Sequence, residues 1–314
     1  MAARMGLSLG TAGFERIPLG VGTAAWGSRL VWGYGRAYAA LDLQAAFAAA
    51  VSRGVTLFDT AEIYGWGSAE RLLGQFIAAT SRQVAIATKF MPYPWRLRPD
   101  RLLVALSGSL DRLGVAAVDL YQMHRPWPPL SIETWMNAMA DAVDTGLTRA
   151  VGVCNYDLQQ MVRAHAVLAG RGVQLAANQV HYSLLYRDPE HNGLLRACQG
   201  LGVSLIAYSP LAMGVLAGTY TLDTLPGGLR GRRLQRQLGQ SRLERLRLLL
   251  PLLREIGQAH GGRTPAQVAL NWVICKGAVP IPGAKRAAQA EENAGAVGWR
   301  LSSAEIKALD AASS

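Results

Sequence analysis

The stretch VTLFDTAEIYGWGSAERLLG, residues 55–74, holds one complete unit of the fold that this sequence predicts. An apolar, β-branched run ends at Asp59, and a short loop punctuated by glycines follows it. A helical pattern then begins at Ser68, which we expect to be the N-cap, with Glu70 in the first turn. A strand, a loop and a helix in this order form the unit that the rest of the chain repeats.

Eight such units follow one another without an obvious linker. Their expected strands span residues 17–23, 55–60, 83–90, 118–124, 148–155, 173–180, 203–210 and 278–283. Strands that alternate with helices imply a parallel sheet, and eight units in 314 residues fit a closed barrel. A doubly wound sheet would need a glycine-rich phosphate turn after its first strand, but GVGTAA (20–25) has Ala25 where the third glycine belongs. We therefore expect a single α/β domain over residues 1–314, a (β/α)8 TIM barrel.

Capping signals mark several of the expected helix starts. Asp157 has Gln160 as a capping-box partner, and Thr264 has Pro265 and Gln267 after it. The stretch SSAEIKALDAA (302–312) predicts one further helix with a capping box at the C-terminus.

The composition excludes several classes of protein. Hydrophobic residues make up 50% of the chain and charged residues 17%, which is enough for a large core. No uninterrupted apolar run is long enough for a membrane span, and the N-terminal stretch lacks the apolar region of a secretory signal. The three cysteines are scattered without C-x-x-C spacing, so we expect no metal site and a reducing compartment. The expected location is cytoplasmic, or plastid if a transit peptide was removed.

Positive charge is concentrated after the seventh expected strand. The net charge is +11 at pH 7, and part of it lies in the arginine-rich residues 229–250. Such a cluster attracts nucleic acid, anionic lipid or a phosphorylated small molecule, or it forms an ordinary solvated face. We expect a long loop rich in glycine and arginine here, followed by a helix near 241–260.

Polar residues stand at the carboxyl ends of seven expected strands. In (β/α)8 barrels the reacting groups come from these ends and from the loops after them. One polar strand end is usually a loop cap, whereas seven in register indicate a lined pocket. The seven residues are Thr23, Asp59, Lys89, His124, Asn155, Gln179 and Tyr208.

Four residues at this mouth combine into a specific chemistry. Tyr64 has a phenol whose ordinary pKa is about 10, so at neutral pH it donates a proton rather than accepting one. A Lys89 cation close by favours the phenolate and makes the phenol a better acid. Asp59 can hold that lysine in place, and His124 can orient a substrate oxygen. The set is suited to protonating an oxyanion that forms at a carbonyl carbon. Since no side chain supplies the matching hydride, a nicotinamide cofactor is required.

From about residue 15 to 312, the chain resembles the aldo-keto reductases, in particular the subgroup similar to potassium-channel beta subunits and bacterial or plant-type aldo/keto reductases. The matching pieces are FDTAEIYG, IATKF, VDLYQMH, AVGVCNY, ANQVHYSLLYR, IAYSPLAMGVLAG, TPAQVALNWV and PIPGAKRAAQAEENAGAVGWRLS. The resemblance implies the same barrel, with an N-terminal β-hairpin first and extra helices after strand 7 and at the C-terminus. It also implies NADPH-dependent reduction of aldehydes or ketones by the tetrad Asp59, Tyr64, Lys89 and His124, with Tyr64 as general acid.

The resemblance also assigns residues to NADPH. Asn155 and Gln179 match positions that hold the nicotinamide carboxamide, and Tyr208 matches the aromatic that stacks on the nicotinamide ring. Lys285 and Arg286 favour NADPH over NADH, because the extra 2′-phosphate requires extra cations. The remaining matches are Thr23, Ala24 and Asp59 near the first strands, Ser209, Pro210, Leu211 and Met213 along the pyrophosphate, and Gly283, Lys285, Gln289, Glu292 and Asn293 at the adenosine end.

Aromatic residues in the loops suggest the substrate. Trp26, Trp66, Trp95 and Trp127 fall in loops over the barrel mouth, where they would suit an apolar or aromatic carbonyl, or would pack the loops together. The family pattern departs at Cys154, which stands where a serine is usual. With the arginine-rich segment placed beside the cofactor, we expect a small carbonyl substrate as partner, no nucleic acid, and a monomer or weak oligomer.

Two alternatives stay beside this interpretation. One is a cofactor-bearing regulatory subunit with little turnover, similar to the channel beta subunits; His124 and the absence of an inactivation-like N-terminal extension speak against it. The other is an isomerase or aldolase that uses Lys89 as a Schiff base, which leaves Asn155, Gln179 and Tyr208 unexplained.

Overall fold

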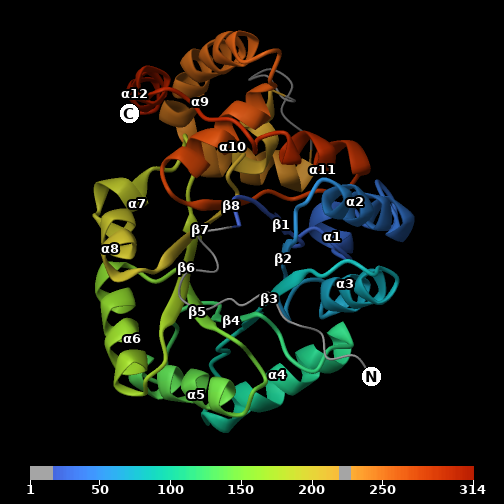
Figure 1. Cartoon of the computed structure of the whole chain (residues 1–314), viewed down its shortest axis with the longest axis vertical. Coiled ribbons are helices and arrows are strands. Elements are labelled where there is room, and N and C mark those ends of the chain that lie inside the picture. The colour runs from blue at the N-terminus through green and yellow to red at the C-terminus, as the bar shows by residue number, and fades with distance from the viewer. Residues whose placement is uncertain (1–16, 219–227) are drawn as a thin grey trace.

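Eight parallel strands form the centre of the molecule, and helices surround them (Figure 1). The computed structural model describes residues 17–218 and 228–314. The strands are β1 (Gly20–Gly22), β2 (Leu57–Asp59), β3 (Ala85–Phe90), β4 (Leu120–Met123), β5 (Val151–Cys154), β6 (Leu175–His181), β7 (Ser204–Tyr208) and β8 (Val279–Ile281). Each strand pairs with the next in the sequence. The Gly22 amide donates to the Pro282 carbonyl oxygen (3.1 Å), which brings the two ends of the sheet together. The predicted (β/α)8 barrel is confirmed.

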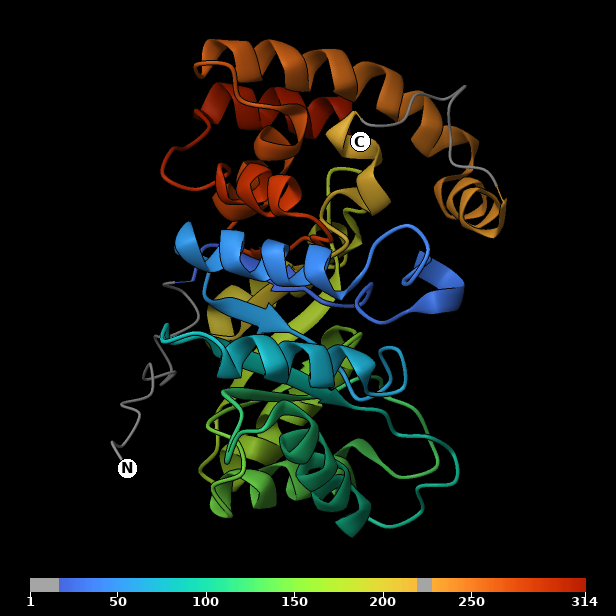
Figure 2. The same cartoon turned by 90° about the vertical axis from the view of Figure 1, so that its right-hand side faces the viewer.

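The helices follow the strands in the predicted alternation. They are α1 (Arg29–Trp32), α2 (Ala40–Ser52), α3 (Ser68–Ala78), α4 (Asp100–Leu113), α5 (Ile132–Asp144), α6 (Leu158–Gly170), α7 (Asp188–His191), α8 (Leu194–Leu201), α9 (Gly228–Ala259), α10 (Pro265–Cys275), α11 (Ala287–Ala294) and α12 (Ser303–Ala312), with a 3-10 helix, η2, over Ala212–Ala217. The capping boxes that begin at Asp157, Thr264 and Ser302 are all formed. The expected extra helices are α9 and α12, which lie side by side at one end of the molecule (Figure 2). The expected β-hairpin falls on residues 1–16, outside the described part of the chain.

The start of α3 differs from the prediction. Its N-cap is Gly67, at φ 81°, and Ser68 is already the first helical residue, so its side chain makes no capping hydrogen bond. The chain enters the helix through a left-handed residue, a conformation that favours glycine. Glu70 is fully buried and accepts hydrogen bonds from Thr88 Oγ1 and Arg112 Nε, both at 2.6 Å. It therefore joins α3 to β3 and α4 instead of facing solvent.

The segment after β7 also differs from the prediction. Helix α9 begins at Gly228 rather than near residue 241, and Gly239 (φ 64°, ψ 172°) interrupts it. Arginine, leucine and glutamine are good helix formers, so the composition that suggested a loop is compatible with a helix. The interruption falls at a glycine because this backbone conformation disfavours a side chain.

A small apolar layer fills the barrel below its mouth. Its members are Leu57, Ala85, Ala87, Leu120, Ala150, Ala177, Ile206, Val279 and Ile281. A larger apolar cluster lies between the strands and the surrounding helices. The small side chains at residues 85, 87 and 177 leave room above them for longer polar side chains from the same strands.

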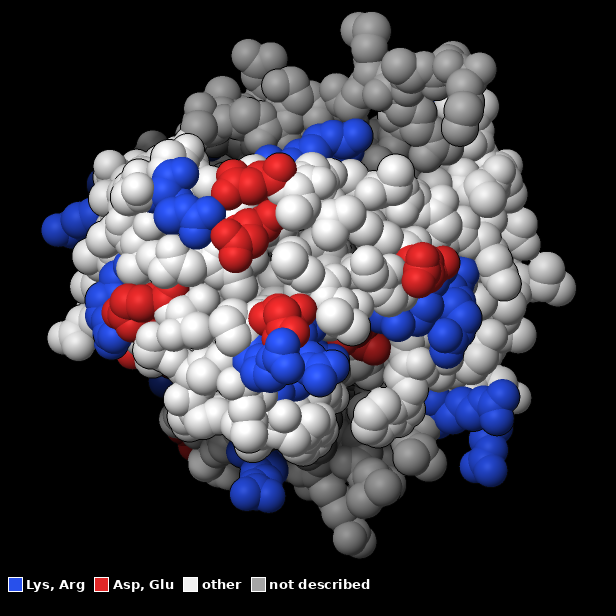
Figure 3. Space-filling view, turned by 90° about the horizontal axis from the view of Figure 1, so that it is seen from below, with Lys and Arg blue, Asp and Glu red and all other residues white. Residues whose placement is uncertain are grey.

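The molecular surface carries mixed charge in the view from below. Figure 3 shows several basic side chains directly beside acidic ones, with others spread around the edge of the view. Ion pairs on the surface include those of Arg171 with Asp141 (2.9 Å) and Asp144 (2.8 Å). In the ranges 17–218 and 228–314, no helix combines the length and the apolar character that crossing a bilayer requires.

The close approach of α3 and α4 generates a stability prediction. A Cβ atom at Gly74 would lie 2.6 Å from the Leu113 carbonyl oxygen, so Gly74→Ala forces the two helices apart. We expect a loss of about 1–3 kcal/mol in unfolding free energy, measured by urea denaturation. Gly170→Ala is the matched control: nothing lies within 4 Å of its Cβ, so it should be neutral or stabilise by up to about 1 kcal/mol. Equal stability of the two variants would show that the contact contributes nothing.

Candidate active site

The structure brings the four residues of the expected tetrad together at the barrel mouth. Lys89 Nζ forms an ion pair with Asp59 Oδ2 and donates to the Thr60 carbonyl oxygen (2.8 Å). The same nitrogen lies 5.1 Å from the centroid of the Tyr64 ring. The Tyr64 and His124 rings meet edge to face, with centroids 5.9 Å apart. A carboxylate, a cation, a phenol and an imidazole from three strand ends and one loop therefore share one site.

A pair of amides beneath the ion pair completes its hydrogen bonding. Gln122 Nε2 donates to Asp59 Oδ1 (3.1 Å), and Gln179 Nε2 donates to the same oxygen (2.8 Å) and to Gln122 Oε1 (3.3 Å). Gln122 was not among the expected site residues. The signal for it was present, since Gln122 and His124 are two residues apart and a strand points both to the same face.

Burial and charge set the protonation states of this site. Burial alone lowers the pKa of Lys89, but Asp59 and then Tyr64 outweigh it and raise that pKa above its ordinary value. Burial raises the pKa of Tyr64 to about 12, although Lys89 acts in the opposite direction. Lys89 therefore acts on the phenol in the expected direction, but burial outweighs it. Tyr64 stays protonated, and Lys89 stays charged, throughout the physiological pH range.

His124 is neutral in this environment. Burial, then the positive charges of Lys89 and Arg125, lower its pKa to about 3. Its Nδ1 atom is buried and has no hydrogen-bond partner among the described residues. A neutral imidazole beside Tyr64 carries one N–H donor and one acceptor, which is the form that can orient a carbonyl oxygen.

The residues expected at the nicotinamide end form a second polar group. Asn155, at φ 62°, donates from Nδ2 to the His124 carbonyl oxygen (3.1 Å) and to Cys154 Sγ (3.1 Å). Its Oδ1 accepts from the Tyr208 hydroxyl (3.0 Å). Burial raises the pKa of Cys154 to about 12, so the thiol that replaces the usual serine remains neutral. Gln179 turns its amide nitrogen inward to Asp59, so any contact with a carboxamide falls to its oxygen.

Two aromatic rings, from His181 and Tyr186, stack behind Tyr208. The His181 ring lies 5.2 Å from the Tyr208 ring and 3.7 Å from the Tyr186 ring, with interplanar angles of 16° and 26°. The Arg242 guanidinium of α9 lies 4.2 Å from the centroid of Tyr186. The stack therefore connects α9 with the ring that is expected to contact the cofactor.

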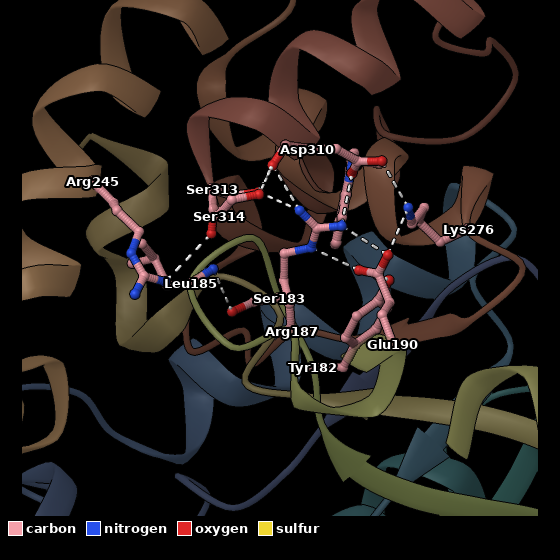
Figure 4. A network of polar contacts seen from close by, with 11 residues as sticks. Tyr182, Ser183, Leu185, Arg187, Glu190, Arg245, Lys276, Asp310, Ser313 and Ser314 are labelled. Atoms are coloured by element: carbon pink, nitrogen blue, oxygen red, sulfur yellow. Dashed lines mark hydrogen bonds and ion pairs between the residues drawn. The ribbon is translucent and has the colours of Figure 1, made fainter. Parts of the chain in front are cut away.

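An ion-pair network holds the loop that carries Tyr186. Arg187 donates to both oxygens of Glu190 (2.8 and 2.9 Å) and to the Asp310 carbonyl oxygen (2.7 Å). Lys276 joins Glu190 (2.7 Å) to Asp310 (2.9 Å), and Tyr182 donates to Glu190 (2.9 Å). Figure 4 shows these groups converging between the loop after β6 and helix α12.

The expected pyrophosphate and adenosine residues lie after β7 and β8. Ser209 (φ 51°) and Met213 (φ 57°) have left-handed backbones, so the chain turns sharply through Pro210 and Leu211. After β8, Gly283 bridges to Gly22 of β1. At the expected adenosine end, Lys285 N donates to Gln289 Oε1 (2.8 Å), and Asn293 Nδ2 donates to the Gly283 carbonyl oxygen (3.5 Å). The Glu292 carbonyl oxygen accepts from Gln267 Nε2 (3.0 Å). After β1, Thr23 Oγ1 donates to the Asp59 carbonyl oxygen (3.0 Å), and Ala24 is exposed.

The prediction that four tryptophans line the substrate pocket is wrong for one of them, Trp26, which lies in the core. Trp26 is 0% exposed, packs against Phe58 and Phe76, and donates from Nε1 to the Ala284 carbonyl oxygen (2.9 Å). It belongs to the core because the first loop folds back on β2 and α3. Trp66, Trp95 and Trp127 are exposed by 84%, 72% and 39%.

A cavity of about 240 Å³ lies next to the loop that carries Tyr64. Its walls include Ile63, Trp66 and Tyr93 together with charged side chains, but none of the four tetrad residues. Within the described ranges, no group of three His, Cys, Asp or Glu side chains is arranged to hold a metal ion.

His124 and His181 generate a prediction about acid sensitivity. The pKa of His124 is about 3, and burial lowers that of His181 to about 4, whereas both would be near 6.5 in the unfolded chain. Below pH ~6.5 the unfolded chain binds protons that the folded chain does not. The unfolding free energy therefore decreases as the pH is lowered, by up to about 1.4 kcal/mol per pH unit for each histidine. We expect their imidazole NMR signals to stay constant from about pH 8 to about pH 5. A His124→Gln, His181→Gln double variant should lose this part of the acid sensitivity; titration of either ring near pH ~6.5 would contradict the assignment.

Comparison with known proteins agrees with this geometry. A family model described as "Aldo/keto reductase family" matches residues 18–314 of this chain. Chloroplastic pyridoxal reductase of Arabidopsis thaliana is 42% identical over 93% of this chain and 82% of its own. A thermostable aldo-keto reductase solved with the inhibitor epalrestat is 33% identical, with a TM-score of 0.73 over 94% of both chains. An aldo-keto reductase from Klebsiella pneumoniae, solved with NADPH, is 28% identical, with a TM-score of 0.72 over 94% of this chain and 90% of that one. The protein therefore belongs to the aldo/keto reductase family.

Proposed function

We propose that this protein reduces aldehydes or ketones to alcohols with NADPH as the hydride donor. The observation that carries the proposal is the buried Asp59–Lys89 ion pair beside a protonated Tyr64 and a neutral His124. An ion pair of this kind is costly to bury, and a purely structural role does not require a phenol and an imidazole next to it.

The donor set fits a nicotinamide dinucleotide. Strands β5, β6, β7 and β8 are neighbours in the barrel, and each supplies part of this set from its end or from the segment after it. The parts are, in this order, the Asn155 amide, the Gln179 amide, the Tyr208 ring with the sharp turn at 209–213, and the cation Lys285. This order matches a carboxamide, a pyridine ring, a pyrophosphate and a 2′-phosphate in the order in which the dinucleotide carries them. When bound, NADPH supplies the hydride that no side chain can supply. The NADPH complex of the Klebsiella relative supports the same choice.

The residues of the chain itself handle the proton. Tyr64 donates its phenolic proton to the carbonyl oxygen as negative charge develops there. Lys89 remains a cation and stabilises the phenolate that is left behind, because an opposite charge favours the ionised form. Asp59 holds Lys89 in position, and the amides of Gln122 and Gln179 hold Asp59. Neutral His124 donates a hydrogen bond to the same carbonyl oxygen and orients it.

Aromatic side chains in the loops and the Arabidopsis relative bear on the substrate class. The Arabidopsis relative is named a pyridoxal reductase, and the exposed aromatic rings of Trp66, Trp95 and Trp127 are compatible with a flat aldehyde. Pyridoxal therefore belongs in the first panel of carbonyls, together with aromatic, aliphatic and sugar-derived aldehydes. NADPH oxidation that depends on one of these carbonyls supports the proposal. NADPH binding without turnover would favour a cofactor-bearing subunit.

Tyr64→Phe tests the proton donor. The variant keeps the ring but removes the proton, so we expect kcat to fall by about 10²- to 10⁴-fold while the Kd for NADPH, measured by fluorescence titration, stays within about twofold. Tyr121→Phe is the matched control and should retain full activity. Tyr121 is buried, and among the described residues its hydroxyl bonds only to the Leu102 carbonyl oxygen, at 3.4 Å. Full activity in Tyr64→Phe would exclude Tyr64 as the acid.

A further inference from the structure

The loop between β1 and α2 (residues 25–38) contacts the segment 284–286 that follows β8. Trp26 Nε1 donates to the Ala284 carbonyl oxygen (2.9 Å), and Arg286 Nη2 donates to the Ala37 carbonyl oxygen (3.1 Å). Figures 1 and 2 show α2 next to α11, although more than two hundred residues separate them in the sequence. The loop therefore lies along the expected adenosine end of the site rather than over the substrate.

Two aromatic rings of this loop surround the side chain of Lys285. Its Nζ atom lies 5.6 Å from the centroid of the Trp32 ring and 5.1 Å from the centroid of the Tyr38 ring. Both distances are within the range in which an ammonium group is attracted to an aromatic face. Each of the three residues 284, 285 and 286 thus has a contact with the loop.

The Tyr38 ring is held firmly, and the Trp32 ring is carried by the last residue of a short capped helix. Tyr38 is 5% exposed, its hydroxyl donates to the Ala25 carbonyl oxygen (2.5 Å), and its ring meets the Tyr34 ring edge to face at 5.8 Å. Helix α1 ends at Trp32 and is capped by Gly33, whose left-handed backbone (φ 76°) lets its amide donate to the Arg29 carbonyl oxygen (3.1 Å). The two rings can therefore fix the position of a flexible lysine.

An aromatic face differs from a carboxylate as a partner for a cation. The ring attracts the ammonium group through its quadrupole but carries no charge that would neutralise it. A lysine held in this way is ordered in advance, so less side-chain entropy is lost when an anion binds.

We propose that Trp32 and Tyr38 are positioning residues for Lys285, and that they thereby set the preference of this site for a 2′-phosphate over a 2′-hydroxyl. The inference rests on the proposed function, because it takes NADPH as the ligand. It gives the aromatic first loop a role in choosing the cofactor.

Binding measurements with purified protein test this directly. Kd values for NADPH and NADH are measured by fluorescence titration, and those for adenosine 2′,5′-bisphosphate and 5′-AMP by calorimetry. Trp32→Leu and Tyr38→Leu should each weaken NADPH and the bisphosphate by about threefold to tenfold, and leave NADH and 5′-AMP within about twofold. Tyr38→Phe is the matched control, which keeps the ring, loses the hydroxyl bond to Ala25, and should keep the preference. Thermal melts identify any variant that is not folded.

Lys285→Ala separates this inference from the proposed function. It should abolish the preference for the 2′-phosphate, and Trp32→Leu should then cause no further loss in that background. If Lys285→Ala removes the preference for the 2′-phosphate but the ring variants do not, the positioning role of the rings is wrong, while the assignment of NADPH as cofactor is kept. Equal weakening of NADPH and NADH by the ring variants, or an additive loss in the Lys285→Ala background, would also overturn it. An unchanged preference in Lys285→Ala would overturn both the 2′-phosphate assignment and the inference.

Discussion

The ion pair between Lys89 and Asp59, buried inside the barrel, is the constraint on which the rest of the site depends. Removing two charges from water costs several kcal/mol for each ion, and mutual attraction offsets this only when the remaining polar atoms are also satisfied. Here the Thr60 carbonyl oxygen and the amides of Gln122 and Gln179 complete the hydrogen bonding. Strands β2, β3, β4 and β6 must therefore keep a register that places all of these groups at the same height along the barrel axis.

The layer below the ion pair shows how the barrel makes room for it. Alanines at 85, 87 and 177 occupy inward positions, and Gly152 lies beside Gln122, where a Cβ atom would approach Gln122 Cγ to 3.2 Å. Small side chains in one layer allow long polar side chains in the next, because the interior is close-packed. Desolvation at this mouth keeps the Tyr64 phenol protonated and the His124 imidazole neutral.

At both ends of the expected cofactor site, aromatic side chains pack against the residue that is expected to contact the cofactor. At one end His181 and Tyr186 stack behind Tyr208, and the network of Figure 4 anchors their loop to α12. At the other end Trp32 and Tyr38 hold Lys285. In both cases the residue expected to touch the ligand comes from one segment, and its support comes from a segment distant in the chain.

The sequence by itself determined the order of strands and helices, the capping boxes at Asp157 and Thr264, and the polar residues at the strand ends. These features depend on neighbouring residues, through periodicity and local hydrogen bonds. The interruption of α9 at Gly239 and the start of α3 after Gly67 depend on left-handed backbones at glycines, which composition describes poorly. Only the tertiary structure decided that Trp26 belongs to the core, that Gln122 supports Asp59, and that the first loop holds Lys285. The physical reason is that a side chain's destination depends on which distant segment packs against it, and no local pattern contains that information.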